Sequence, residues 1–585
     1  MALSRFVLPF PDVGGGIKPS SGAKLFFYAT GTSTPASTFS DLAGSTANTN
    51  PVIADANGLF SDIFLSGTFK VILKDANDVQ IWEADPVTNI DEVPSTSVTF
   101  LQGGTGAVAR TVESKLRESV SVKDYNAKGD IAVTDDTAAI QAAVDSAVVS
   151  SVGYTDVFIP PGLYSISSPI LCPANYRFVG NNAVIKAAVG FTGVTRNNIG
   201  DGGTIVLESM LLFLLGNYND IGGAQRDAAF IGRGITLDCN NVTKSGVYIE
   251  RMPYSTIECK VINTIAGGNA IDVGPYCWGT HLNGNIIEDF AENAIAIGFG
   301  SNGVTITSPR IWGKTKTGAS GVLVKSLANI NGLVVNGGFI EKIAYGVSVQ
   351  RGNGPILLNG VDLEVCSNSC VLVNGNVADA YKSTVGIKNC YMSSIGSNVD
   401  ANYAKVTVEG SRLRLGDNFK TGSGGFIDAS NNDYESGLPA IVAGSNVALD
   451  VEQSWTPTLL DDSLSPSEGQ TYSVASGTYS RSANKVFFKG IMTLASIGTL
   501  ATGESARIGG LPFSSSSTAN TQSTINIGYG AGLSLSAVNA VSGYIGVGSD
   551  YATLQKFSAA TGTSNLTVGE VSASGVLIFS GWYTL

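Results

Sequence analysis

The chain has 585 residues, of which 71 are glycine and only 14% are charged, so turns are plentiful and long solvated helices are scarce. A formal net charge of −12, with no cluster of lysine and arginine, argues against nucleic acid and anionic membranes as partners. Seven cysteines without a CxxC pair and a single histidine argue against zinc, and we expect neither a metal nor a cofactor.

The N-terminal region, residues 1–95, alternates strand and turn signals and is predicted to be a small β-sandwich domain. Its first residues lack the apolar core and cleavage site of a signal peptide. The longest apolar run of the chain, at residues 210–215, is too short to cross a bilayer. We therefore expect a protein that is made in the cytosol and does not insert into membranes.

Two short helices are predicted between this domain and the rest of the chain. Residues 96–119 are predicted to be a neck with one helix at 110–118, which has Val112 and Leu116 as its apolar positions. Because so short a helix is marginal alone, it predicts association with further copies. A second helix is predicted at 134–144, with an Asp/Thr N-cap and an apolar face, and it would cover the open end of a stacked β structure.

The middle of the chain repeats a four-residue phrase with alternating apolar side chains every 24 to 27 residues, for example from 246 to 270 and from 294 to 321. A second strand phrase follows each one, as at residues 256–259 and 281–284. Because one repeat cannot bury its own apolar face and has no room for a crossover helix, the repeats must stack. An all-β protein with a parallel β-helix over residues 120–450 is therefore predicted. The phrases begin at Gly246, Ala270, Ala294, Gly321, Gly346 and Cys370.

The composition changes near residues 454–457, where the repeats have already become irregular. Strand patterns rich in serine, threonine and glycine follow at 478–481, 485–492 and 576–582. They predict a separate C-terminal β-sandwich domain over residues 451–585.

Several motifs spread along the chain resemble bacteriophage tailspikes that act as capsule or exopolysaccharide depolymerases. The segment 120–143, which ends in Thr-Asp-Asp-Thr-Ala-Ala-Ile-Gln-Ala-Ala, is similar to the entry of a pectate-lyase-like β-helix. The resemblance implies a right-handed, single-stranded parallel β-helix in a homotrimer, with residues 1–95 anchoring it to the virion and residues 451–585 serving in trimerisation or carbohydrate binding. The other motifs are at 22–32, 55–60, 159–164, 234–238, 455–457, 477–481 and 510–513.

The same resemblance implies where the protein acts. It implies a component of the phage virion that is made in the host cytoplasm, is attached to the phage tail or an adaptor protein by its N-terminal domain, and acts at the bacterial surface. It implies binding and endo-cleavage of a bacterial capsular or exopolysaccharide. It does not identify the catalytic residues, which vary widely within the family.

A ladder of acidic side chains is expected along one face of the stack. Equivalent positions of successive turns lie about 4.8 Å apart in a parallel stack. Carboxylates stacked so closely repel one another, which makes them candidates for shifted pKa values and for catalysis. The predicted ladder comprises Asp238, Asn263, Glu288, Trp312, Glu341 and Glu364.

Glycoside hydrolysis needs two carboxyl groups, about 5–5.5 Å apart for retention and about 6.5–9.5 Å apart for inversion. Glu341 and Glu364 are one turn apart, and Glu288 and Glu341 are two turns apart around Trp312, so both outcomes stay open. Asp272 is predicted to point outward and to add a second acidic column. The plainer alternative is that these acids only solvate turns.

Aromatic rings and cations near the ladder are candidates for sugar binding, because aromatic faces suit the C–H faces of sugars and cations neutralise uronates. The predicted binding residues are Tyr276, Trp278, His281, Arg310, Trp312 and Arg351, with Lys314 and Lys316 as further cations.

The acids outnumber the cations in the ladder, which favours a hydrolase. A polysaccharide lyase, which removes a C5 proton from a uronate with a basic residue, remains open, as does a receptor-binding spike without enzymatic activity. A site built between subunits is a further alternative.

Overall fold

The computed structural model describes most of the chain, and no helix within the described ranges is long and apolar enough to cross a membrane. These ranges are residues 3–6, 21–88, 95–131, 133–147, 155–172, 176–197, 204–214, 229–325, 330–350, 354–375, 383–435, 439–442, 445–482, 484–535, 539–558 and 562–585.

The chain divides into two compact units, residues 1–118 and 119–585. In the first unit an antiparallel sheet in the order β3-β2-β5-β6 buries Leu25, Phe27 and Val71. The predicted neck helix is present as α1, but Leu116 on it is 66% exposed. The sandwich and anchoring assignments for this unit stay predictions. Its elements are β1 (Ser4–Arg5), β2 (Lys24–Ala29), β3 (Val52–Ile53), β4 (Phe64–Leu65), β5 (Thr68–Lys74), β6 (Gln80–Thr88), β7 (Thr99–Phe100), β8 (Arg110–Thr111) and α1 (Val112–Leu116).

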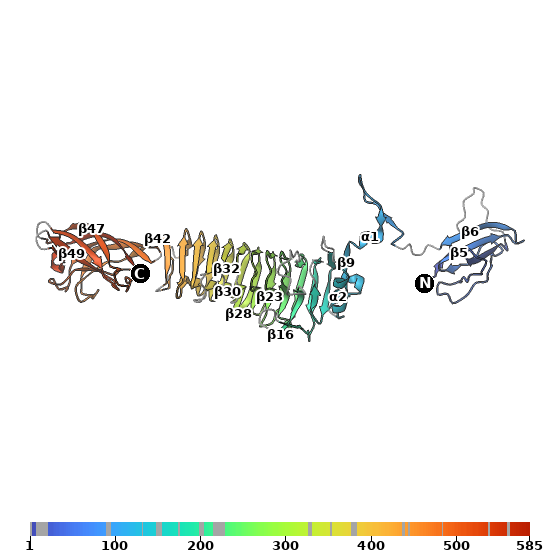
Figure 1. Ribbon diagram of the computed structural model, residues 1–585, viewed down its shortest axis with the longest axis horizontal. Helices are drawn as coiled ribbons and strands as arrows, with labels where there is room; N and C mark the ends of the chain where they lie inside the picture. The colour runs from blue at the N-terminus through green and yellow to red at the C-terminus, as the bar shows by residue number, and fades with distance from the viewer. Residues whose placement is uncertain are drawn as a thin grey trace. The chain divides into compact units, whose positions relative to one another are not determined.

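A parallel β-helix makes up most of the second unit (Figure 1). Val247 pairs with Ile271, and Ile271 with Ile295, so the repeated phrases stack in register as predicted. Each regular turn has three strands, one more than the two phrases of the repeat. The third strand was not recognised in the sequence because it is often only three residues long. We call the three stacks of strands row A, row B and row C, in chain order.

The strands of each row follow one another up the stack. Row A contains β10 (Thr155–Ile159), β13 (Tyr176–Gly180), β18 (Ala229–Ile231), β21 (Thr256–Ile257), β24 (His281–Asn283), β27 (Val304–Thr307), β29 (Leu333–Asn336), β31 (Pro355–Asn359), β34 (Ser383–Lys388), β37 (Ala404–Glu409) and β40 (Phe426–Ser430). Row B contains β11 (Gly162–Ile166), β14 (Ala183–Ala187), β19 (Ile235–Asp238), β22 (Lys260–Ile262), β25 (Ile286–Glu288), β32 (Asp362–Cys366), β35 (Tyr391–Ser394), β38 (Arg412–Arg414) and β41 (Asp433–Tyr434). Row C contains β12 (Ile170–Cys172), β17 (Ser209–Leu214), β20 (Ser245–Glu250), β23 (Asn269–Val273), β26 (Asn293–Ile297), β33 (Ser369–Asn374), β36 (Ser397–Asn402) and β39 (Asp417–Thr421). Rows B and C share the long strands β28 (Arg310–Val324) and β30 (Phe339–Val349), and β15 (Val194–Asn197) pairs with β16 (Thr204–Leu207) outside the rows.

The predicted second helix is α2 (Thr137–Ser146), and it closes the N-terminal end of the β-helix beside β9 (Ser119–Ser121) and the 3-10 helix η1 (Val122–Tyr125) (Figure 1). Ile140 and Val144 on α2 are fully buried in the same apolar core as the turns of the β-helix. The Gln141 side chain accepts a hydrogen bond from the Leu171 N–H (2.8 Å) and donates one to the Leu171 C=O (3.0 Å), which satisfies the edge of β12.

The predicted helix cap differs in detail. Asp136 precedes α2, but its carboxylate accepts hydrogen bonds from the backbone N–H groups of Lys128 (2.6 Å) and Gly129 (3.2 Å) instead of capping the helix. Asp135 accepts the Thr137 N–H at 3.0 Å. The preceding loop folds back onto the helix start and competes for the Asp136 side chain.

Beyond the last turns the strands become antiparallel around a second core that contains Trp455, Phe488 and Phe579. Arg481 joins this part to the β-helix, because its guanidinium donates to the Ser445 C=O (2.6 Å) and to Asn446 Oδ1 (2.7 Å). The roles predicted for this part stay predictions. Its elements are β42 (Val447–Trp455), β43 (Thr458–Leu460), β44 (Thr471–Ser482), β45 (Lys485–Ser496), β46 (Arg507–Gly509), β47 (Ser523–Ala531), β48 (Asn539–Ile545), β49 (Ala552–Ser558), β50 (Gly562–Asn565), α3 (Val568–Val571) and β51 (Val576–Thr584).

The helical cap provides a test of the stacking. Ile140→Ala should lower the free energy of unfolding by about 2–5 kcal/mol, because it opens a cavity between α2 and the first turns. Val133→Ala, at a residue that is 83% exposed just before the helix, is the control and should stay within about 0.5 kcal/mol of the wild type. Guanidinium unfolding of both variants measures this, and equal losses in the two would contradict the role of the cap.

Candidate functional site

The outward face of row B carries two adjacent columns of side chains, because residues two apart on a strand share a face. The register pairs Glu288 with Trp312, Trp312 with Glu341, and Glu341 with Glu364, as predicted. We keep the name ladder for Asp238, Ile262, Glu288, Trp312, Glu341 and Glu364. The flanking column comprises Thr236, Lys260, Ile286, Arg310, Phe339 and Asp362.

The prediction that Asn263 belongs to the ladder is wrong. Ile262 takes that position, since it pairs with both Asp238 and Glu288. Asn263 has a left-handed backbone (φ 60°), like Asp289 (φ 55°) one turn on, so it is the turn residue that ends the strand. Ile262 is apolar although it faces outward. Aligning the repeats on the last apolar residue of each strand therefore shifts this turn by one residue.

Two of the ladder acids are held by neighbouring groups. Asp238 Oδ1 accepts hydrogen bonds from Asn263 Nδ2 (2.8 Å) and the Asn240 N–H (2.9 Å), and Lys186 Nζ lies 3.8 Å from its other oxygen. Glu288 forms an ion pair with Lys260 at 2.7 Å. These contacts neutralise both carboxylates and favour a structural role for them.

Glu341 and Glu364 differ from the other acids of the ladder. Within the part of the chain that the structure describes, neither carboxylate forms an ion pair or a side-chain hydrogen bond. Both side chains are half-buried and lie side by side on adjacent strands. They are therefore the acids of the ladder that remain available to a ligand.

Asp362 is a third acid at this place, and the sequence analysis missed it. It lies two residues before Glu364 on β32, so the two share a face, and this spacing is the signal that would have found it. Burial, followed by the charges of Glu364 and Glu341, raises the pKa of the Asp362 carboxyl above its usual range. Its Oδ1 is buried and has no hydrogen-bond partner among the described residues. This group keeps its proton to higher pH than an ordinary aspartate.

An exposed aromatic surface lies beside these acids. Trp312 is 38% exposed between Glu288 and Glu341, and Phe339 in the flanking column is 37% exposed. The Lys342 ammonium group lies 4.9 Å from the centroid of the Trp312 ring system. Exposed rings of this size next to charged groups suit a ligand with both apolar and polar faces, as a sugar has.

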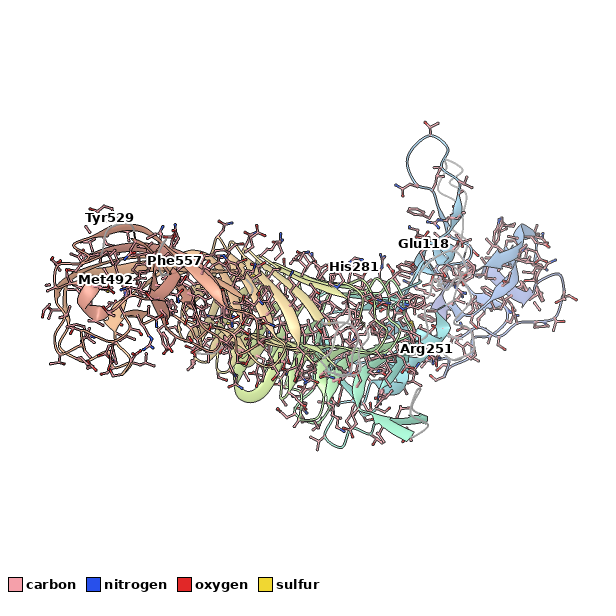
Figure 2. All side chains as sticks on the ribbon, turned by 60° about the vertical axis from the view of Figure 1, so that its left-hand side comes forward. Glu118, Arg251, His281, Met492, Tyr529 and Phe557 are labelled. Atoms are coloured by element: carbon pink, nitrogen blue, oxygen red, sulfur yellow. The ribbon has the colours of Figure 1, made fainter. Side chains whose placement is uncertain are left out.

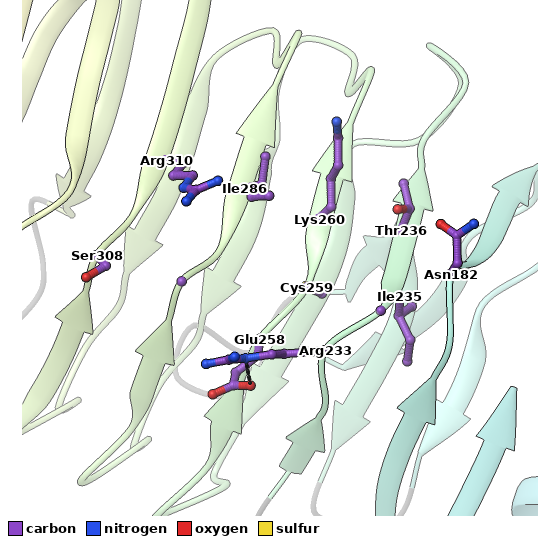
Figure 3. Close-up of a pocket in the computed structure, with 12 residues that line it drawn as sticks. Asn182, Arg233, Ile235, Thr236, Glu258, Cys259, Lys260, Ile286, Ser308 and Arg310 are labelled. Carbon is purple, nitrogen blue, oxygen red and sulfur yellow. Dashed lines mark hydrogen bonds and ion pairs between the residues drawn. The ribbon is translucent and has the colours of Figure 1, made fainter.

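A pocket of about 480 Å³ continues the face toward the N-terminal end of the β-helix (Figure 3). Figure 3 shows Thr236, Lys260, Ile286 and Arg310 on successive strands along one side, and the Arg233–Glu258 ion pair (3.1 Å) on the other. The remaining lining residues are Asn182, Gly234, Ile235, Cys259, Gly284 and Ser308.

The predicted second acidic column around Asp272 is wrong. The positions in register with Asp272 are Tyr248 and Ala296, neither of which is acidic. Asp272 is only 9% exposed, pairs with Lys325 at 2.7 Å and accepts a hydrogen bond from Asn269 Nδ2 at 2.8 Å. Strand alternation predicted correctly that it faces away from the core, but a lysine from two turns up covers it.

The structure places Tyr276, Trp278 and His281 away from the ladder. Tyr276 and Trp278 lie at the corner between rows C and A, where Tyr276 packs on Phe299 (ring centroids 5.6 Å apart) and Trp278 Nε1 donates to the Gly300 C=O (3.0 Å). His281 is exposed on β24 of row A (Figure 2). Arg351 and the side chains of Lys314 and Lys316 lie outside the described residues.

The seven cysteines lie in the apolar core of the β-helix. All seven cysteines are buried and unpaired, and burial raises the pKa of Cys239 and Cys259 to about 12. These two therefore pack as small apolar side chains, as predicted. Over the described ranges, no group of three or more His, Cys, Asp and Glu side chains is placed to hold a metal ion.

The raised pKa of Asp362 predicts a pH-dependent stability. The folded state binds this proton more tightly than the unfolded state, in which the pKa is near 3.8. The carboxyl group therefore lowers the free energy of unfolding as pH rises from the unfolded-state pKa through the folded-state pKa. The loss is complete at pH values above both. Asp362→Asn should therefore be more stable than the wild type at pH 7, and the gap should close as pH falls toward 3.8. Urea midpoints measured from pH 3.5 to 7.5 test this, with the exposed Asp417→Asn as the control. A gap that is independent of pH would contradict it.

One family model matches the start of the β-helix. Residues 119–212 match the model described as rhamnogalacturonase A/epimerase, pectate lyase-like. This stretch contains the α2 cap and the first turns of the stack. The match and the parallel rows together confirm the pectate-lyase-like β-helix that the sequence motifs indicated.

Known proteins resemble larger parts of the chain at low identity. The mannuronan C5-epimerase AlgE5 of Azotobacter vinelandii is 26% identical over 269 residues, which are 41% of this chain and 26% of that protein. The Dettilon tailspike protein (gp208) has a TM-score of 0.44 and 13% identity, covering 81% of this chain and 96% of that one. A tailspike protein mutant of E. coli bacteriophage HK620, in complex with a hexasaccharide, has a TM-score of 0.44 and 10% identity, covering 84% and 98%.

The chain spans only 6–26% of the length of the curated relatives it matches. Solved phage tailspikes are among the proteins that this chain is similar to, and at these TM-scores and identities the similarity assigns no residue a role. The chain carries a pectate-lyase-like parallel β-helix.

Proposed function

We propose that the protein is a phage tailspike depolymerase that binds and endo-cleaves a bacterial capsular or exopolysaccharide by glycoside hydrolysis. One observation carries the proposal: Glu341 and Glu364 lie on adjacent strands of the outward face and have no partner among the described residues. Adjacent parallel strands are about 4.8 Å apart. Long side chains on such strands reach the separations that glycosidases use.

The chemistry divides between the two acids and their neighbours. One carboxyl group protonates the leaving oxygen, and the other attacks the anomeric carbon or activates water. Asp362, whose pKa is raised by burial and by the charges of Glu364 and Glu341, lies beside this pair. Trp312 offers a flat apolar surface next to Glu341 for the sugar ring.

The proposal also includes how the protein assembles and where it acts. The exposed Leu116 on the short helix α1 fits contact with further copies, so we place the protein in a homotrimer. The N-terminal unit attaches it to the phage tail or to an adaptor protein. It is made in the host cytoplasm and acts on the virion at the bacterial surface.

A second candidate is β-elimination, or C5 epimerisation, on an acidic polysaccharide. Two cations near Trp312 favour this second candidate. Arg310 lies two residues before Trp312, and Lys342 lies over the Trp312 ring. Both reactions begin by removing the C5 proton of a uronate, which requires a base and a cation at the carboxylate.

Product analysis on purified capsule separates these candidates. New reducing ends without ultraviolet absorption indicate hydrolysis, and reducing ends with an unsaturated uronate indicate a lyase. An unchanged chain length with altered uronate composition indicates an epimerase. Binding without any of these products would leave a receptor-binding spike and contradict the enzyme proposal.

Glu341→Gln and Glu364→Gln should each lower turnover by about 10²-fold or more, as loss of an acid or nucleophile does. The free energy of unfolding should change by no more than about 0.5 kcal/mol, because neither carboxylate has a partner to lose among the described residues. Glu409→Gln, an acid on the outward face of row A that pairs with Lys388 at 3.0 Å, is the control for turnover. Near-wild-type rates in both ladder variants would move the site elsewhere.

The two units predict a division of labour. A truncated chain that lacks residues 1–110 keeps α1 and should retain most of the depolymerisation, since every acid named above lies in the second unit. It should fail to assemble onto virions. Complementation of a phage that lacks the spike, with capsule cleavage measured in parallel, tests both statements. A folded truncation without activity would contradict this division.

A further inference from the structure

The pocket beside the ladder has an unusual balance of charge for this chain. Its lining contains three cations, Arg233, Lys260 and Arg310, and one acid, Glu258. The whole chain has a net charge of −12. A concentration of positive charge in an acidic protein attracts an anionic ligand to that place.

Two of the three cations are already neutralised. Arg233 pairs with Glu258 across the pocket at 3.1 Å, and Lys260 pairs with Glu288 of the ladder at 2.7 Å. Arg310 is exposed and forms no ion pair with any described residue. Among the described residues, the Arg310 guanidinium is therefore the positive charge of the pocket that has no counter-charge.

We infer that this pocket binds the carboxylate of an acidic sugar, with Arg310 as the residue that contacts it. A guanidinium presents two parallel N–H donors that match the two oxygens of a carboxylate. The inference rests on the proposed function and narrows its substrate to a polysaccharide that contains acidic sugars.

The position of Arg310 connects the pocket to the acids. Arg310 and Trp312 are two residues apart on β28 and face the same way, about 7 Å apart along the strand. A sugar whose carboxylate is held by Arg310 therefore lies beside Trp312, and the chain continues toward Glu341 and Glu364. The Lys260–Glu288 pair forms the boundary between the pocket and the ladder.

Neighbouring groups also favour a carboxylate over a neutral sugar. Ile286 separates Lys260 from Arg310 in the flanking column, so the two cations stand on either side of an apolar surface. A bound neutral sugar would cover the Arg310 guanidinium and remove water from it without supplying a counter-charge. This desolvation would have no ion pair to compensate it.

The test is binding of the full-length protein to an array of bacterial capsular oligosaccharides, each present in its native form and with its carboxyl groups reduced to alcohols. We expect that the wild type binds an acidic glycan and loses about 10-fold or more in affinity when that glycan is reduced. Arg310→Gln should lower affinity for the native glycan about 10-fold and leave the reduced form unchanged. Arg310→Lys should have an affinity for the native glycan between those of the wild type and Arg310→Gln, because it keeps the positive charge and loses the two parallel N–H donors.

Arg412→Gln is the matched control. Arg412 continues the flanking column but pairs with Asp433 at 3.0 Å, so its loss should not affect either form of the glycan. Equal affinity for native and reduced glycans, or no effect of Arg310→Gln, would overturn the inference. If the protein cleaves capsule but fails these tests, the pocket assignment alone is wrong. If it neither binds nor cleaves any glycan, the proposed function fails as well.

Discussion

The stacking of turns is the constraint on which this molecule depends. A single turn of the β-helix has three short strands, and its inward side chains become buried only against the turns above and below. Val247, Ile271 and Ile295 are fully buried because each is covered by its equivalent in the next turn. Such a stack must be closed at its ends. Helix α2 closes one end with Ile140 and Val144, and at the other end Arg481 links the last turns to the antiparallel strands that follow.

Stacking has an electrostatic consequence on the outside of the β-helix. A residue that returns at each turn forms a column with a spacing of about 4.8 Å, so like charges accumulate unless they are compensated. Much of the outer surface compensates them, as the Lys260–Glu288 and Lys325–Asp272 pairs do. At Glu341, Glu364 and Asp362 the described residues supply no such compensation. Burial, followed by the charges of Glu364 and Glu341, raises the pKa of Asp362. An uncompensated acidic cluster next to an exposed tryptophan is therefore a local exception to how the rest of the surface is built, and this difference is the reason to place function there.

The acids and the cationic pocket occupy different stretches of one continuous face. Arg310 and Trp312 lie on the same strand, so a glycan chain following the stack would meet a positive charge first and carboxyl groups afterwards. This order suits an acidic polymer. The cation holds a carboxylate of the substrate away from the acids, which would otherwise repel it. Whether the substrate is hydrolysed or loses its C5 proton then depends on which residue reaches the scissile bond.

The sequence by itself determined the parallel β-helix, its cap and most of the ladder, because a period of 24 to 27 residues with alternating apolar positions has one stable packing. Glu288, Trp312, Glu341 and Glu364 followed from that period alone. Asn263 was misplaced because Ile262 is apolar and outward-facing, so composition concealed the end of the strand, which the left-handed turn defines. Asp272 was assigned from the direction it faces and Tyr276 as an aromatic residue close to the ladder along the chain. Only the tertiary structure decided that Lys325 covers Asp272 and that Tyr276 belongs to another corner. Asp362 was missed because the ladder was predicted from one position in each turn, and Asp362 lies two residues before that position. Its raised pKa depends first on burial and then on Glu364 and Glu341, which the sequence does not show. A period specifies which residues stack, whereas pairing, burial and charge balance depend on side chains from different turns, which only the folded stack brings together.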